Sequence, residues 1–180
     1  LSAPDPAEQD NAEEDLQNTI NIEGTTEETV ETAAQEAAET LQFSETDTLS
    51  WPLSGDVILN YSMDQSVYFA TLDQYKYNPA LVIAGDVNSK VTAAADGQVL
   101  SVETTAETGE TVTVDIGNGY QLIYGQLKDI QFAVGDRISQ GDLIGFVSEP
   151  TKYYSVEGSN LYFQMLKDGT PVNPMDYLGG

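Results

Sequence analysis

Near its C-terminal end the chain reads Gly158-Ser159-Asn160-Leu161-Tyr162-Phe163-Gln164-Met165, and the turn-forming pair Asp168-Gly169 follows shortly after. Apolar and polar residues alternate through this stretch, which is typical of a β-strand with one face in a core. One face carries Leu161, Phe163 and Met165, and the other carries Asn160, Tyr162 and Gln164. A tight turn is predicted at Asp168-Gly169, and Asn173-Pro174 predicts where the chain leaves the sheet.

Composition excludes several classes of function. The 180 residues include 30 acidic and six basic side chains, for a net charge of −24, and contain neither Cys nor His. This charge argues against nucleic acid or an anionic membrane as a partner. Without Cys there is no disulfide or thiol chemistry, and without His there is no histidine base, Ser-His-Asp triad or His-containing zinc site. Calcium or magnesium held by carboxylates alone stays open, although no Asp-x-Asp calcium loop supports it.

Charge divides the chain near Ser50. Residues 1–50 hold 14 acidic residues and no Lys or Arg, while residues 51–180 hold 16 acidic and all six basic residues. We therefore expect an acidic leader or tether over 1–50 and a folded domain over 51–180. Thr25 and Glu28 have the spacing of a capping box, and the Ala-rich residues behind them predict a short helix over about 26–42. The leader is otherwise expected to be disordered.

Short strands and turns fill the rest of the chain. Apolar strand cores occur at Val57–Leu59, Leu81–Ile83 and Val99–Leu100. The clearest hairpin joins Thr111–Ile116 to Tyr120–Tyr124. No stretch after Trp51 has the apolar pattern of a helix of ten or more residues, so an all-β sandwich or barrel is predicted.

Five motifs in order resemble the LytM-type M23 zinc metallopeptidases, which cleave peptide crosslinks in bacterial peptidoglycan. The resemblance runs from about Trp51 to Leu178. Its motifs are Val91–Val99, Tyr124-Gly125-Gln126-Leu127, Val134-Gly135-Asp136, Gln140-Gly141, and the alternating strand continuing through Val172-Asn173-Pro174. It implies an antiparallel β-sandwich, or barrel-sandwich hybrid, with a groove over one sheet.

The family's catalytic positions are all changed in this chain. Asn78 and Val82 stand at the His and Asp of its His-x-x-x-Asp zinc motif, and Gln126 stands at the His of its Tyr-x-His-Leu motif. Asn160 and Tyr162 stand at the two histidines of its His-x-His strand. Valine cannot ligate zinc, neutral Asn and Tyr are poor ligands, and Asn and Gln cannot act as bases near neutral pH.

The sequence therefore predicts an inactive pseudo-peptidase without a cofactor. We expect a repacked, inert site in which the three amides among these positions satisfy one another by hydrogen bonds, and we favour it over a re-purposed small-ligand site. The loops Met63–Tyr77 and Lys152–Gly158 are expected to flank the groove. Most tyrosines are expected to pack, with Tyr124, Tyr153 and Tyr154 as candidate groove or partner contacts.

The resemblance extends to degenerate LytM domains of spore-forming bacteria, the stage-II sporulation protein Q branch, on the loop Thr151–Ser159. It implies a non-catalytic extracytoplasmic binding or scaffold module that engages a protein partner or a cell-wall peptide, held by an anchor upstream of Leu1. Two alternatives are an active zinc endopeptidase with unusual ligands and a structural cell-wall-binding module. A biotinyl or lipoyl carrier is disfavoured, because neither Lys90 nor Lys128 has the sequence context of a modified lysine.

Overall fold

The computed structural model describes residues 41–180. Residues 1–40 of the acidic leader, and with them all but the last two residues of the helix predicted over about 26–42, lie outside these residues. The described part consists of short strands and two 3₁₀ turns, and it has no α-helix. Accordingly, no helix within it is long and apolar enough to cross a membrane.

The elements follow one another along the chain as β1 (Val57–Leu59), β2 (Ser62–Phe69), β3 (Gln74–Asn78), β4 (Ala80–Ala84), β5 (Lys90–Thr92), β6 (Gly97–Thr105), β7 (Gly109–Gly117), β8 (Tyr120–Lys128), β9 (Arg137–Ile138), β10 (Leu143–Val147), η1 (Lys152–Tyr154), β11 (Asn160–Lys167), β12 (Thr170–Val172) and η2 (Pro174–Asp176).

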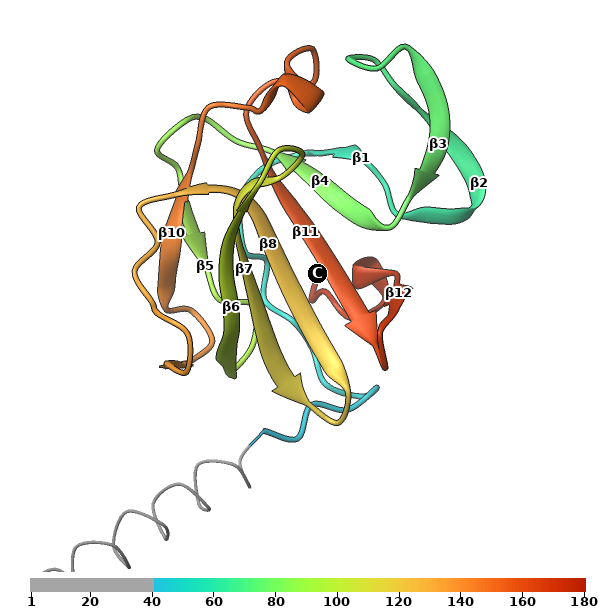
Figure 1. The fold of residues 1–180 in the computed structure, drawn as a ribbon. Helices are drawn as coiled ribbons and strands as arrows, with labels where there is room; N and C mark the ends of the chain where they lie inside the picture. The colour runs from blue at the N-terminus through green and yellow to red at the C-terminus, as the bar shows by residue number, and fades with distance from the viewer. Residues whose placement is uncertain (1–40) are drawn as a thin grey trace, which may run out of the picture. The chain divides into compact units, whose positions relative to one another are not determined.

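Ten strands form one antiparallel sheet in the order β1-β4-β11-β8-β7-β6-β9, with β12 added beside β11 (Figure 1). Strand β10 pairs with both β8 and β5. The sheet thereby continues around the core into a second layer. The prediction of an all-β, antiparallel, sandwich-like fold is confirmed.

Strand β11 lies at the centre of this sheet, between β4 and β8. Its alternation is as predicted: Leu161, Phe163 and Met165 are completely buried in the core, while Tyr162 and Gln164 are half-buried on the other face. The turn after β11 is also as predicted, because Asp168 and Gly169 both have positive φ, at 51° and 80°. Two such residues form the tight turn whose twist matches a hairpin.

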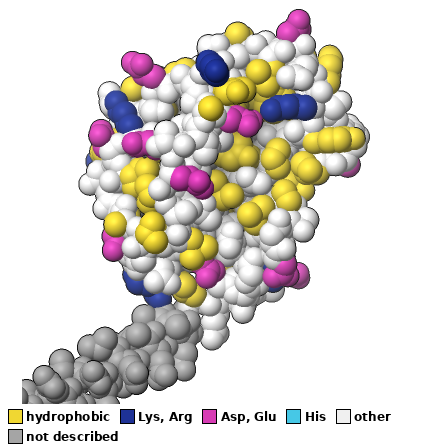
Figure 2. Space-filling view, in the orientation of Figure 1, with side chains coloured by type: hydrophobic (Ala, Val, Ile, Leu, Met, Phe, Trp, Pro, Cys, Tyr) yellow, Lys and Arg dark blue, Asp and Glu magenta, His cyan; other side chains and the backbone are white. Residues whose placement is uncertain are grey.

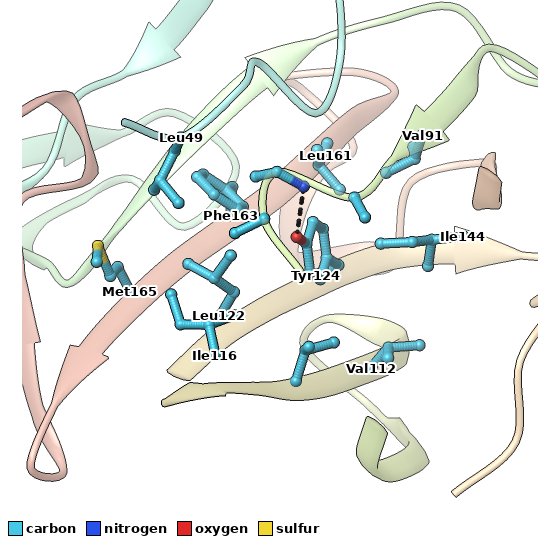
Figure 3. Close-up of a cluster of buried hydrophobic side chains, with 14 of the residues drawn as sticks. Leu49, Val91, Val112, Ile116, Leu122, Tyr124, Ile144, Leu161, Phe163 and Met165 are labelled. Carbon is cyan, nitrogen blue, oxygen red and sulfur yellow. Dashed lines mark hydrogen bonds between the residues drawn. The ribbon is translucent and has the colours of Figure 1, made fainter. Parts of the chain in front are cut away.

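The main core lies between the two layers of the sheet (Figure 3). Val91 and Ile144 of β5 and β10 share one hydrophobic cluster with side chains of β7, β8 and β11. Tyr124 is completely buried among them, and its hydroxyl accepts a hydrogen bond of 3.0 Å from the Ala94 amide. That bond satisfies the polar end of an otherwise apolar side chain.

Residues 41–50 pack on the β domain, although the charge pattern assigns them to the leader. Phe43 and Leu49 are buried in the main core, and the Phe43 ring lies 5.1 Å from that of Tyr120. The Asn118 side chain donates to the Phe43 carbonyl at 3.0 Å. The charge of the chain changes near Ser50, but the compact unit begins at Leu41, because Phe43 and Leu49 are buried in its core.

The segment expected as a loop over Met63–Tyr77 is instead the β2–β3 hairpin, a separate two-stranded sheet. Tyr68 pairs with Tyr75, and the strands connect through residues 70–73. Figure 1 shows this hairpin standing off the main sheet on the side of β4 and β11.

Candidate functional site

The site positions lie on the face of the sheet away from the main core. Across the three neighbouring strands β4, β11 and β8, Val82 pairs with Tyr162, and Tyr162 pairs with Gly125. Directly opposite residues of antiparallel strands share a face, so the Val82 and Tyr162 side chains lie together. A Cβ atom on Gly125 would lie only 3.2 Å from the Cβ of Tyr162. The glycine at this position therefore leaves space for the tyrosine side chain.

A second hydrophobic cluster occupies this face. Its buried members are Phe69, Val82 and Tyr154, which come from β2, β4 and η1. The partly buried side chains of Leu59, Val67, Leu72, Tyr153 and Tyr162 pack around them. We call this set the site cluster. The β2–β3 hairpin and the η1 loop thus meet over the position where the family resemblance predicts a groove.

Three hydrogen bonds join the hairpin to the η1 loop. The Glu157 carboxylate accepts hydrogen bonds from the Thr71 hydroxyl and, at 3.2 Å, from the Thr71 amide. The Thr71 hydroxyl in turn accepts from the Val156 amide at 2.8 Å. Burial raises the pKa of the Glu157 carboxyl, but hydrogen bonds from the Thr71 side chain and from nearby backbone amides outweigh it and leave that pKa below its usual value. The carboxylate form is therefore the one that holds the hairpin tip.

Tyr162 is held as a neutral phenol. Burial, with the charge of Glu107 adding to it, raises the pKa of Tyr162 to about 12. Its hydroxyl lies 2.9 Å from the Gln164 Oε1 atom and donates to it. At neutral pH this hydroxyl keeps its proton, and it is already engaged with Gln164.

The three amide side chains do not satisfy one another, so that expectation is wrong. Asn78 donates to the Asn60 carbonyl at 2.8 Å, at the base of the hairpin. Asn160 donates to the Gly158 carbonyl at 2.8 Å. Each amide side chain is instead hydrogen-bonded to backbone groups near it, because the three residues lie on different strands.

Gln126 links two loops beside the site. It has a φ of 63°, a left-handed conformation within β8 where the pairing register with β7 shifts, and its side chain is completely buried. Its Oε1 atom accepts from the Thr151 amide at 3.2 Å, and its Nε2 atom donates to the Glu107 carbonyl at 3.4 Å. The glutamine therefore positions the η1 loop against the β6–β7 turn.

The residues that the family resemblance assigns to the zinc positions do not fit a zinc ion. Val82 is apolar and buried, Tyr162 is protonated, and the Asn78 side chain donates to the Asn60 carbonyl. One buried polar atom, Asn160 Oδ1, has no hydrogen-bond partner among the described residues. A single neutral oxygen cannot replace the three ligands of a catalytic zinc. Within residues 41–180 no three His, Cys, Asp or Glu side chains converge as a metal site.

The three candidate contact tyrosines have different surroundings. Tyr124 lies in the main core and Tyr154 in the site cluster, and both are at most 2% exposed, so neither can contact a partner as expected. Burial raises the pKa of both hydroxyls far above the usual range. Tyr153 is half-buried, with the Lys152 Nζ atom 5.6 Å from its ring centroid. It alone of the three is partly accessible.

Phe69 and Thr71 are the site residues that the sequence analysis missed. Both belong to the hairpin that was expected to be a loop. The sequence did contain a signal for a hairpin. Val67 and Phe69 alternate with Tyr68, a short turn follows, and Tyr75 and Tyr77 continue the pattern on the other side of the turn. The contact between Thr71 and Glu157 spans 86 residues, and no local pattern announces it.

Comparison with known proteins adds to this geometry. The sequence profile of peptidase family M23 matches residues 76–174. Stage II sporulation protein Q of Bacillus subtilis (strain 168) is 28% identical over 88 residues, which cover 49% of this chain and 31% of that protein. Murein hydrolase activator EnvC of Escherichia coli (strain K12) is 30% identical over 100 residues, 55% of this chain and 23% of that protein. The chain spans about a third or less of these relatives.

Two solved structures resemble the fold. The SpoIIQ–SpoIIIAH pore-forming complex gives a TM-score of 0.63 at 22% identity, covering 73% of this chain and 91% of the matched chain. Helicobacter pylori Csd3 gives 0.62 at 21% identity, covering 78% of this chain and 37% of that one. At these identities the likeness concerns the fold alone.

Proposed function

The chain belongs to peptidase family M23, and we propose that within this family it is a non-catalytic binding or scaffold module of the cell envelope. It keeps the architecture of a peptidoglycan endopeptidase and uses it to engage a protein partner or a cell-wall peptide. It acts outside the cytoplasm and is held there by an anchor upstream of Leu1.

One observation carries this proposal: the Val82–Tyr162 pair lies inside the site cluster. These residues stand at two of the family's zinc-ligand positions, yet they pack with Phe69 and Tyr154. A working zinc site needs three ligands and an open position for water or substrate. Apolar packing supplies neither, and it stabilises the fold where the family would place its chemistry.

The acid–base chemistry is equally changed. Gln126 and Asn160 stand at the family's catalytic histidines, and neither side chain titrates near neutral pH. Gln126 is already committed to two loops, at Thr151 and Glu107. Both positions therefore serve local structure, which supports a binding role over catalysis.

The relatives support a role in the envelope. Two of them are a sporulation protein and a murein hydrolase activator, and the first also appears in a complex with a second protein, SpoIIIAH. We extend from them only the general role, a domain of this fold that binds another protein.

A zinc measurement tests the proposal directly. The full chain is prepared with zinc, dialysed and assayed for bound metal, and the same sample is incubated with purified peptidoglycan. We expect no stoichiometric zinc and no release of crosslink peptides. One tightly held zinc per chain, or zinc-dependent cleavage, would overturn the proposal in favour of an endopeptidase with unusual ligands.

Two further arms separate the binding partners. Co-sedimentation with purified peptidoglycan tests the cell-wall peptide, and capture from an envelope extract tests a protein. Retention by one of them supports the module, and the retained material identifies its partner class. Failure of both would refute the binding role.

A further inference from the structure

The outer face of the β2–β3 hairpin carries three exposed tyrosines. Tyr68, Tyr75 and Tyr77 are 45%, 71% and 57% exposed, and we call them the tyrosine face. Tyr68 and Tyr75 are cross-strand partners, and Tyr77 follows Tyr75 on the same side of β3. Figure 2 shows hydrophobic side chains gathered over the part of the surface where β2 and β3 lie in Figure 1.

The hairpin behind this face is held in place. On its inner side Phe69 is 2% exposed and packs in the site cluster. Its tip is bonded to Glu157 through Thr71, and its base is bonded through Asn78 to the Asn60 carbonyl. A platform fixed at both ends and along its inner side loses little conformational entropy when it binds.

The surroundings of the tyrosine face are acidic. The Tyr68 hydroxyl donates to the Asp73 carboxylate at 2.8 Å. That hydrogen bond, together with the charges of Asp73 and Glu157, raises the pKa of Tyr68. Lys76 lies between Tyr75 and Tyr77 in sequence but is engaged elsewhere, 3.5 Å from Glu107 and 4.4 Å from the centroid of the Phe69 ring.

Aromatic rings of this fold already hold cations. Three of the six basic side chains lie over rings: Lys76 over Phe69, Lys152 over Tyr153 and Lys167 over Tyr120. The rings of the tyrosine face are exposed, and the Asp73 carboxylate lies at the Tyr68 hydroxyl. A cation from outside would meet both a ring quadrupole and a negative potential there.

We propose that the tyrosine face docks a cationic segment, rich in Lys or Arg, of the module's protein partner. This inference rests on the proposed function and specifies the surface and the chemistry of the partner. The charge of the domain, with 16 acidic and six basic residues over 51–180, favours a basic partner over an acidic one.

The test uses synthetic peptides and variants of equal charge. A lysine-rich peptide, its arginine-rich counterpart and a glutamine counterpart are titrated into the full chain at low salt, and affinity is measured by calorimetry. We expect both cationic peptides to bind and the glutamine peptide not to bind. The double variant Tyr75→Ser/Tyr77→Ser should weaken binding about tenfold, since each exposed cation–π contact changes an equilibrium roughly two- to fivefold.

Two variants serve as controls. Tyr75→Phe/Tyr77→Phe keeps the rings and should bind within about twofold of the wild type. Leu100→Ser/Val102→Ser removes two exposed apolar side chains from β6 and should also bind normally. Since all three variants keep the net charge, bulk attraction to an acidic protein is the same in each.

Three results would overturn the inference: equal binding by the serine variant, weak binding by the phenylalanine variant, or equal affinity for the glutamine peptide. An envelope partner captured equally by wild type and serine variant would also refute it, while leaving the proposed function intact. Zinc-dependent cleavage of peptidoglycan would instead refute the proposed function.

Discussion

Val82→Asp places a carboxylate where the family's zinc motif carries one and tests whether this position is a packed interior. Val82 is completely buried on β4, opposite Tyr162 and against Phe69 and Tyr154. The new carboxylate would lie among apolar side chains. The Lys76 ammonium, which lies over the Phe69 ring, is already paired with Glu107 at 3.5 Å.

The expected loss of stability has two parts. Removing the buried valine surface costs about 1.5–3 kcal/mol. Leaving an uncompensated buried charge costs a further ~3–5 kcal/mol. At pH 7 the total of about 5–8 kcal/mol approaches the whole stability of a typical domain, which is about 5–15 kcal/mol.

The loss should depend on pH with a definite sign. Burial raises the pKa of an introduced aspartate in the folded state above its unfolded value of about 3.9. The charge penalty is therefore absent below about pH 4 and grows as the pH rises toward the folded pKa. The variant should be markedly more stable, relative to the wild type, at pH 4 than at pH 7.

Urea denaturation of the full chain at both pH values measures this difference. The matched control is Val156→Asp, which makes the same change at a side chain that is 67% exposed and should stay within about 0.5 kcal/mol of the wild type. The reasoning fails if Val82→Asp matches this control. It fails equally if added zinc stabilises Val82→Asp and not Val156→Asp, since the site would then accept a metal.

Three further predictions concern the packing around the site and the start of the domain. Tyr154→Ala should cost about 3–5 kcal/mol in urea denaturation, whereas Tyr153→Ala, at its half-buried neighbour, should cost clearly less; equal losses would contradict the site cluster. Glu157→Gln should lower the hydrogen-exchange protection of the amides near Thr71. In the wild type this protection should fall only below about pH 4. The reason is that the pKa of Glu157 is lower in the folded state than its unfolded value of about 4.3, so the contact is fully formed above that pH. Phe43→Ala should lower the free energy of unfolding by about 3–5 kcal/mol. A negligible loss would mean that the domain begins near Ser50.

Local pattern predicted much of the main sheet. Alternation in β11, the β7–β8 hairpin and the turn at Asp168-Gly169 were all readable, because strand faces and tight turns depend on neighbouring residues. The family resemblance also assigned the five altered positions, and that assignment stays a prediction. The contacts of these side chains could not be predicted from local pattern.

The sequence by itself determined that this chain folds as an antiparallel β domain and that it has no histidine or cysteine for the family's metal chemistry. Only the tertiary structure decided that Phe69 and Tyr154 cover Val82, that Glu157 holds Thr71, and that Phe43 belongs to the core. The physical reason is separation along the chain. Periodicity reports which way a side chain points, whereas the partner it meets depends on strands and loops that are many residues away.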